Sequence, residues 1–334
     1  MADQPDTTAD PGPRSVIIDT DTAGDDTQAL LLAALSDRID LEAVTICAGN
    51  VAFDYEVENA KYTLDLAGVA DDVTVYEGAR DPLLKDHDFA DYVHGEGGLG
   101  GSLFPDTGIE SGDRHGADVI VDAARENPGE ITLVCIAPLT NVALALRKEP
   151  ALNDLLDAVW VMGGNVNCLG NVTPAAEYNF WVDPDAAKVA LEELDVTLVD
   201  WGVTVRDGAL AGETVDELAD AETPYADFFA TVTDHAREFS KERRGVDSVT
   251  VPDALAVACL LDPDIVTESG TYFVDVDERE GLTRGYSLVD EHGVTDGEPR
   301  TRVVESIDGA AFERMIRDML HHGDPMQSPS ESPQ

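Results

Sequence analysis

Lysine is nearly absent from this chain of 334 residues, which contains only five, at positions 61, 85, 148, 188 and 241. Asp and Glu total 68 against 21 Lys and Arg, so the formal net charge is −47. A charge of this sign excludes a general affinity for nucleic acids or anionic membranes. A carboxylate-rich surface with little lysine is typical of proteins that stay soluble in concentrated salt, where a Debye length of about 3 Å screens self-repulsion. We therefore predict a halophilic protein.

Long apolar runs and paired cysteines are lacking as well. No apolar run approaches the roughly 18 residues of a membrane-spanning helix, and residues 1–13 lack the basic and apolar regions of a signal peptide. None of the four cysteines forms a Cys-x-x-Cys pair, which argues against a zinc or redox site; they are Cys47, Cys135, Cys168 and Cys259. We expect free thiols, a reducing compartment and a cytoplasmic location.

Hydrophobic residues make up 43% of the chain and occur in alternating patterns. Short apolar runs predict strands at 14–18, 41–47, 73–76, 131–136, 159–162, 196–199, 272–276 and 301–305. Helical patterns lie at 27–35, 57–66, 117–125, 142–147, 184–191, 254–261 and 310–320, and 214–244 reads as mostly helical. Strands that are apolar on both faces and alternate with helices indicate a largely parallel sheet covered on both sides. We expect one α/β domain over 14–320, loops over 80–112, and disordered tails at 1–13 and 321–334.

Four carboxylates follow the first predicted strand within eight residues: Asp19, Asp21, Asp25 and Asp26. Asp19 and Asp21 are two apart and point the same way at the end of the strand, and a turn with Gly24 leads to the other two. Each close pair costs about 4 kcal/mol at an effective dielectric near 20, of which a helix N-terminus offsets about 1 kcal/mol. The remaining repulsion requires a cation or raised pKa values. Ligands that are all oxygen indicate a hard ion, Ca²⁺ or Mg²⁺.

Other readings of this cluster stay open at this point. Asp25 and Asp26 could be helix-capping residues in an acid-rich chain. Asp19-x-Asp21 after an apolar strand also matches the start of haloacid-dehalogenase-type phosphatases, in which the first Asp attacks phosphate and the second is the general acid. That reading leaves Asp25 and Asp26 unexplained and requires a later lysine. A non-catalytic protein that binds ribose or Ca²⁺ is the third alternative.

Further polar and glycine-rich segments follow in a fixed order: Ala48-Gly49-Asn50, His94-Gly95-Glu96-Gly97-Gly98-Leu99-Gly100, Ala137-Pro138-Leu139-Thr140-Asn141, Met162-Gly163-Gly164, Gly170-Asn171, Glu177-Tyr178-Asn179 and Pro252-Asp253-Ala254. With the acidic cluster, this ordered set resembles the nucleoside hydrolase family of the inosine-uridine preferring type, from about Val16 to beyond Leu261. The resemblance implies a Rossmann-like sheet flanked by helices, with extra helices and strands in the C-terminal third. It also implies hydrolysis of the N-glycosidic bond of ribonucleosides to ribose and free base in nucleoside salvage, by a homodimer or homotetramer.

The resemblance also assigns roles to residues. It implies a Ca²⁺ site made by Asp21, Asp26, the backbone carbonyl of Ile136 and Asp253, with Asp21 as the catalytic base toward a Ca²⁺-bound water. Contacts with the substrate are assigned to Asp25, Asn50, His94, Asn171, Glu177 and Asn179. Cleavage builds oxocarbenium character on the ribose, which nearby carboxylates stabilise.

Two positions depart from the family pattern. Thr22-Ala23-Gly24 stands where Pro-Gly commonly follows the second Asp. Pro252 stands where some members carry the histidine that protonates the leaving base, and where purine-preferring members carry a tryptophan that stacks on it. Candidate replacements elsewhere in the chain are Trp201, Tyr225, Phe228, Phe229 and His235. The preference for purine or pyrimidine bases therefore stays open.

Overall fold

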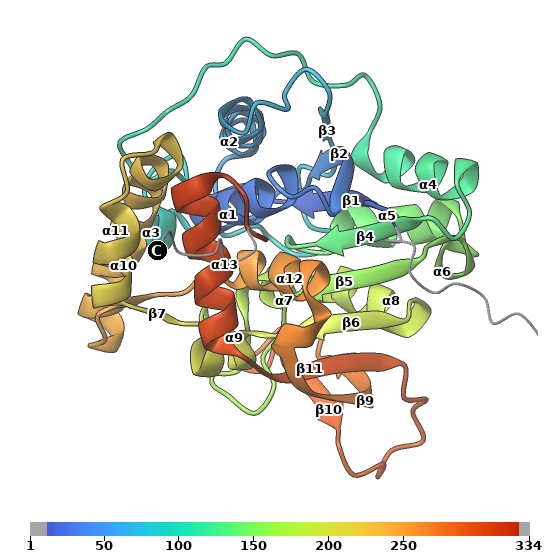
Figure 1. Cartoon of the computed structure of the whole chain (residues 1–334). Helices are drawn as coiled ribbons and strands as arrows, with labels where there is room; N and C mark the ends of the chain where they lie inside the picture. Colours follow the sequence, from blue (N-terminus) through green and yellow to red (C-terminus); the bar gives the residue numbers. More distant parts are fainter. Residues whose placement is uncertain (1–11, 327–334) are drawn as a thin grey trace, which may run out of the picture.

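Nine strands form the central sheet in the computed structural model, which describes residues 12–326 (Figure 1). Their order is β10-β9-β11-β6-β5-β4-β1-β2-β3. The strands are β1 (Arg14–Thr20), β2 (Ile39–Ile46), β3 (Thr74–Glu77), β4 (Ile131–Cys135), β5 (Ala158–Met162), β6 (Val196–Val199), β9 (Val266–Val276), β10 (Ser287–Asp290) and β11 (Thr301–Ile307). Neighbours from β11 to β3 are parallel, and β9 and β10 add antiparallel pairs at one edge. The prediction of a largely parallel sheet is confirmed.

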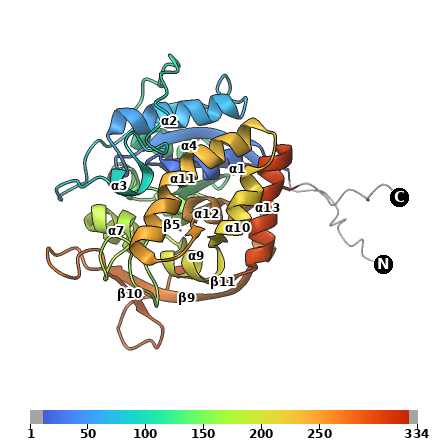
Figure 2. The same ribbon diagram turned by 90° about the vertical axis from the view of Figure 1, so that its left-hand side faces the viewer.

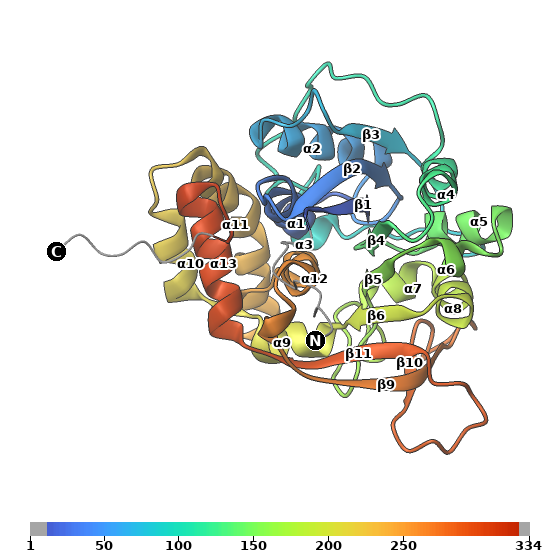
Figure 3. The same ribbon diagram turned by 45° about the vertical axis from the view of Figure 1, so that its right-hand side comes forward.

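Helices cover both faces of this sheet (Figure 3). One face carries α1 (Gly24–Ala34), α2 (Phe53–Leu66), α12 (Pro252–Leu261) and α13 (Gly309–His322), and the other carries α4 (Gly116–Glu126), α5 (Thr140–Lys148) and α8 (Pro184–Glu193). Outside the first layer lie α10 (Gly212–Ala219) and α11 (Pro224–Arg244), together with the short pair β7 (Leu210–Ala211) and β8 (Ser248–Val249). Two apolar clusters, one on each face, bury the sheet.

Helices α1 and α12 form the centre of one layer. All ten residues of α12 are buried, and α1 is buried along most of its length. Helices that are buried on nearly all sides belong in a core, and these two pack against each other. Each begins with acidic residues in its first turn, Asp25 and Asp26 in α1 and Asp253 in α12.

The strand order reverses beside β1, which has β2 on one side and β4 on the other. In open α/β sheets such a reversal leaves a crevice at the carboxyl ends of the strands, where ligands bind. Asp19 lies in register with Thr45 of β2 and Cys135 of β4, so the loops after these strands begin at the same edge. The segments after β1, β2, β4 and β5 therefore meet.

Several elements differ from the sequence-based expectation. Helices α1 and α2 begin at Gly24 and Phe53, three and four residues before their predicted starts at 27 and 57, because acidic residues in both first turns interrupt the apolar pattern. The expected loop 80–112 contains α3 (Asp91–His94), and α6 (Leu152–Leu155), α7 (Tyr178–Val182), α9 (Trp201–Asp207) and β10 were not predicted. These are short elements, for which periodicity is a weak signal.

The predicted tails lie mostly outside the described residues, which exclude 1–11 and 327–334. At the carboxyl end, the expected tail starts two residues too early, because α13 continues through His322 and ends on Gly323 in the left-handed conformation. The four cysteines are free thiols, as expected. Within residues 12–326, no helix combines the length and apolarity needed to cross a membrane.

Candidate active site

Three carboxylates converge where α1 and α12 begin. Asp25, Asp26 and Asp253 each offer an oxygen atom, and these atoms lie within 4.8 Å of one another. The positive ends of two helix dipoles offset part of their mutual repulsion. Oxygen donors at this spacing are the ligands that a hard divalent cation prefers.

Asp26 is held in place by hydrogen bonds to both of its oxygens. Oδ1 accepts the hydroxyl of Thr20 at 2.6 Å, and Oδ2 accepts the backbone N–H of Ala23 at 3.0 Å and the side-chain amide of Asn50 at 3.2 Å. The bond to Ala23 closes the first turn of α1 from its own N3 position. The carboxylate therefore has one fixed orientation toward the cluster.

Asp21 is not one of the three, but it lies close enough to interact electrostatically with all of them, and the Asn50 amide bridges its carbonyl and Asp26. Its Oδ2 accepts the backbone N–H of Asn50 at 2.9 Å, while its Oδ1 is buried without a hydrogen-bond partner. Gly49 makes this approach possible, because a Cβ there would lie 1.9 Å from Asp21 Oδ2. An unpartnered buried carboxylate oxygen carries a desolvation cost, and it leaves Asp21 with one atom free for a cation or a water.

Burial and crowding raise the pKa values of these acids. Burial, followed by repulsion from neighbouring carboxylates, raises the pKa of Asp21 and of Asp253 well above the usual range. Burial raises the pKa of Asp26 to about 7 and that of Asp25 to about 6. A divalent cation would reverse this by favouring the ionised forms. The donor set and the unpartnered Asp21 oxygen thus fit a hard cation.

A cavity opens over this cluster and gathers most of the predicted site residues. Asp25, Asn50, His94, Ile136, Asn171, Glu177, Asn179 and Asp253 all line it. Asp21 and Asp26 are fully buried and lie below the lining, connected to it through Asn50. The residues come from loops at one edge of the sheet and from α1, α3, α7 and α12.

Glu177 caps the N-terminus of α7 in the cavity wall. Its carboxylate accepts the backbone N–H groups of Gly164 at 2.8 Å and of Asn179 at 2.9 Å, and burial raises its pKa to about 7. The Asn179 amide donates to the carbonyls of Ile136 at 3.3 Å and of Met162 at 3.2 Å. The Asn171 side chain accepts the Tyr178 N–H at 2.9 Å. The hydrogen bonds of α7 thus tie together the loops after β4 and β5.

His94 stands at the end of α3, opposite the first turn of α1. Its Nδ1 lies 3.6 Å from Asp25 Oδ1. Burial lowers the pKa of His94 to about 4, so the imidazole is neutral at pH 7. His94 also lines the cavity, and its contact with the substrate stays a prediction.

Residues of α11 also line the cavity, and this helix lies beside α3 (Figure 2). Of the aromatic candidates from the sequence, Trp201 lines the cavity; Tyr225, Phe228, Phe229 and His235 do not. Phe228 and Phe229 pack in the core instead.

The cavity is lined instead by three residues that were not predicted from the sequence: Tyr92, Phe239 and Arg244. The Tyr92 and Phe239 rings lie 5.7 Å apart, and the Arg244 guanidinium lies 4.8 Å from the Trp201 ring. Helical spacing on α11 was the available signal, since Val232, Ala236, Phe239 and Ser240 share one face.

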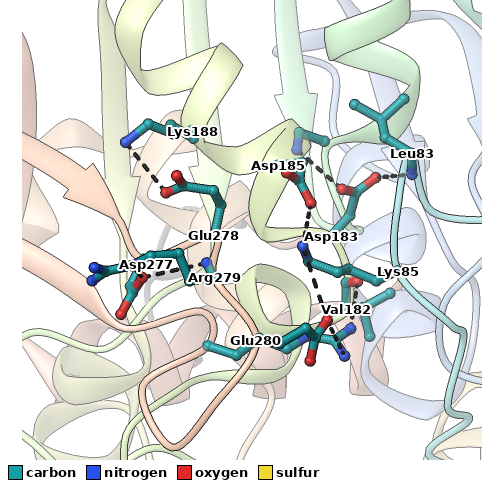
Figure 4. Close-up of polar contacts among 12 residues, drawn as sticks. Leu83, Lys85, Val182, Asp183, Asp185, Lys188, Asp277, Glu278, Arg279 and Glu280 are labelled. Carbon is teal, nitrogen blue, oxygen red and sulfur yellow. Dashed lines mark hydrogen bonds and ion pairs between the residues drawn. The ribbon is translucent and has the colours of Figure 1, made fainter.

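A charged network anchors the loop at 80–90 beside the site (Figure 4). Lys85 pairs with Asp185 of α8 at 2.9 Å and reaches Glu280 at 3.9 Å. Asp183 accepts the Leu83 N–H at 2.8 Å. One of the five lysines thus connects this loop to α8 and to the segment between β9 and β10.

Comparisons with known proteins agree on one family. The sequence profile of the family "Inosine-uridine preferring nucleoside hydrolase" matches residues 16–314. A pyrimidine-specific ribonucleoside hydrolase, RihA, of Enterobacter sp. (strain 638) is 34% identical over 91% of this chain and 97% of its own. Solved structures of a plant nucleoside hydrolase and of a purine-preferring ribonucleoside hydrolase from Gardnerella vaginalis superpose with TM-scores of 0.86 and 0.85. Each is 29% identical and covers 93% of this chain and 99% of its own.

Proposed function

Because this chain belongs to the inosine-uridine preferring nucleoside hydrolase family and is an N-glycosyl hydrolase of ribonucleosides, we propose that Asp21 is its catalytic base and Ca²⁺ its metal ion. The observation that carries the proposal is the buried, unpartnered Oδ1 of Asp21 beside the triad of Asp25, Asp26 and Asp253. The ligands would be Asp21, Asp26, Asp253 and the carbonyl of Ile136. When bound, Ca²⁺ would supply positive charge that orients a water and the ribose hydroxyls and lowers the pKa of that water.

The protein groups then divide the work of cleavage. Asp21 takes a proton from the water that attacks the anomeric carbon, while the bond from that carbon to the base nitrogen breaks. The carboxylates around the ribose stabilise the oxocarbenium character that develops. Asp25, Asn50, Asn171, Glu177 and Asn179 hold the sugar through hydrogen bonds that strengthen as the ring distorts, and His94 forms the wall beside Asp25.

The base would occupy the end of the cavity formed by α3, α9 and α11. Tyr92, Trp201 and Phe239 offer aromatic faces, and Pro252 has no proton to give. Arg244 at the rim is the one Lys or Arg among the described lining residues. Its guanidinium would stabilise the negative charge that develops on the oxygen of a carbonyl-bearing base as the bond breaks, and the released base then takes a proton from the solvent. We therefore propose bases with a ring carbonyl, such as uracil and hypoxanthine, as preferred leaving groups.

Chromatographic assay of inosine, uridine, adenosine and cytidine in multimolar salt with Ca²⁺ tests this function. Release of ribose and free base is expected, fastest for uridine or inosine. Hydrolysis of p-nitrophenyl phosphate with Mg²⁺ in place of nucleoside turnover would favour a phosphatase. Calorimetric binding of nucleoside without turnover would favour a non-catalytic binding protein.

We also propose that the protein is a homo-oligomeric, cytoplasmic and halophilic enzyme. The family resemblance supports a homodimer or homotetramer, which light scattering after size exclusion would test. The four free thiols support a cytoplasmic location, and membership of the nucleoside hydrolase family supports a role in nucleoside salvage. The net charge of −47 supports a halophilic enzyme.

A further inference from the structure

A buried carboxylate outside the proposed catalytic set contacts the loop that carries Asn50. Glu56 of α2 has no exposed surface, and its Oε1 accepts the backbone N–H groups of Gly49 at 3.0 Å and of Val51 at 3.1 Å. The N–H of Asn50 between them donates to Asp21 Oδ2 at 2.9 Å. The backbone N–H groups of three consecutive residues, 49 to 51, therefore all donate to carboxylates, two to Glu56 and one to Asp21.

Glu56 has no compensating cation within residues 12–326. None of the ion pairs found there includes it, and its second oxygen, Oε2, is buried without a hydrogen-bond partner. Glu58 on the same helix behaves differently, since it is half-buried and pairs with Lys61 at 3.0 Å and with Thr107. A buried, unpaired carboxyl group is costly, so stability alone does not explain Glu56.

The contacts of Glu56 fix the backbone on both sides of Asn50. Other groups hold the carbonyls of the same loop: Gly49 O accepts His87 Nε2 at 2.8 Å and the Tyr178 hydroxyl at 2.7 Å. Glu56 holds the two flanking N–H groups. With the backbone fixed, the Asn50 amide reaches Asp26 Oδ2 at 3.2 Å and the Asp21 carbonyl at 3.3 Å, at the edge of the cavity.

We propose that Glu56 is a positioning residue for nucleoside hydrolysis. By accepting the N–H groups of Gly49 and Val51, it directs the Asn50 side chain toward the ribose and the Asn50 N–H toward Asp21. The inference rests on the proposed function, in which Asn50 contacts the sugar. The acceptor oxygen of Glu56 carries the effect, so a side chain that keeps this oxygen keeps the effect. Glutamine has such an oxygen, whereas methionine fills a similar volume without one.

The test compares Glu56→Met, Glu56→Gln, Asn50→Ala and the double variant Asn50→Ala/Glu56→Met, with Glu58→Met as the matched control. Steady-state kinetics use the faster of uridine and inosine, and thermal melts report folding. Loss of an orienting partner typically costs about 10- to 100-fold, and we expect kcat/KM of Glu56→Met to fall by about 30-fold. Glu56→Gln and Glu58→Met should stay within about threefold of wild type. The double variant should fall no further than about twofold below Asn50→Ala, because both changes remove one interaction.

The variants separate the possible failures. Wild-type activity in Asn50→Ala would overturn the proposed role of Asn50 in ribose binding. Reduced activity in Asn50→Ala with unchanged activity in Glu56→Met would overturn the positioning role alone. Losses that multiply in the double variant, or equal losses in Glu56→Gln and Glu56→Met, would assign Glu56 a purely structural role. If Glu56→Met does not fold, Glu56→Gln decides: activity within about threefold of wild type supports the positioning role, and a larger loss in a folded protein overturns it.

Discussion

Asp25 and Asp253 lie in the first turns of two different core helices, and a carboxylate oxygen of one lies within 4.8 Å of a carboxylate oxygen of the other. Burial raises the pKa of Asp25 to about 6 and that of Asp253 well above the usual range. The folded, metal-free protein therefore binds protons that the unfolded chain does not. Binding of the proposed cation would therefore be coupled to the loss of protons from these acids.

Stability without Ca²⁺ should fall as the pH rises. A pKa raised by folding contributes stability below about pH 4, the usual range of carboxyl groups, and this contribution is lost as the pH passes through the folded values near 6 and 7. Ca²⁺ should therefore raise Tm more at pH 8 than at pH 5. Its contribution is about 2.7 kcal/mol at a concentration 100-fold above Kd.

Thermal melts at pH 5 to 8 in EDTA or Ca²⁺, at one fixed salt concentration, would measure this. Asp253→Asn is the control, because it removes one of the coupled acids and should flatten the pH dependence measured in EDTA. Equal Ca²⁺-induced shifts at pH 5 and pH 8 would contradict the coupling.

Replacement of Asp21 should stop the chemistry and leave the fold intact. Asp21→Asn keeps the shape of the side chain but cannot take a proton from water, and general-base catalysis contributes about 10²- to 10⁴-fold. We expect kcat to fall by about 10³-fold, measured by release of the free base. Asp40→Asn on the exposed side of β2 is the control and should match wild type. Full activity in Asp21→Asn would remove Asp21 from the mechanism.

The role proposed for Arg244 predicts that its replacement changes the preference among bases. Arg244→Leu keeps contact with the Trp201 ring but removes the charge, so kcat/KM for uridine and inosine should fall by about 10-fold, the effect of about 1.4 kcal/mol. Adenosine, whose ring has no carbonyl, should be affected less. Arg243→Leu, one residue earlier and exposed, is the matched control. A uniform loss across all nucleosides would show that Arg244 does not read the base.

The acidic surface predicts dependence on salt. With a net charge of −47, self-repulsion is screened only where the Debye length is short, about 3 Å at 1 M salt. Far-UV circular dichroism during dialysis from multimolar KCl to low salt should show unfolding. Addition of Ca²⁺ should shift the midpoint to lower salt, because the ion binds the folded state. Unchanged folding at low salt would count against a halophilic protein.

Much of this site could be predicted from the sequence because its residues follow strands directly. Asp21, Asn50 and Ile136 come at or just after the ends of β1, β2 and β4, and strand ends of a parallel sheet meet at one edge. Asp253 needed the family pattern, since alone it reads as a residue of a helix first turn. Its partnership with Asp25 is a contact over more than 200 positions, which periodicity cannot indicate.

The part of the cavity lined by α3 and α11 could not be predicted from the sequence in this way. Tyr92 lies on the four-residue helix α3, inside a segment predicted as loop, and Arg244 is the last residue of the long helix α11. Phe228 and Phe229 were reasonable candidates by composition, but they turn into the core. Only the packing of α11 against α3 decides which face of α11 lines the cavity.

The charges of the cavity wall should also affect whether a nucleoside or a nucleotide enters the cavity more readily. Asp25, Glu177 and Asp253 line it, and Arg244 at the rim is the one Lys or Arg in the described lining. A nucleoside has no net charge and enters this field without electrostatic work. A nucleotide would bring its phosphate charges close to buried acids, at distances shorter than salt can screen. On the proposed function, we therefore expect these acids to favour nucleosides over nucleotides as substrates.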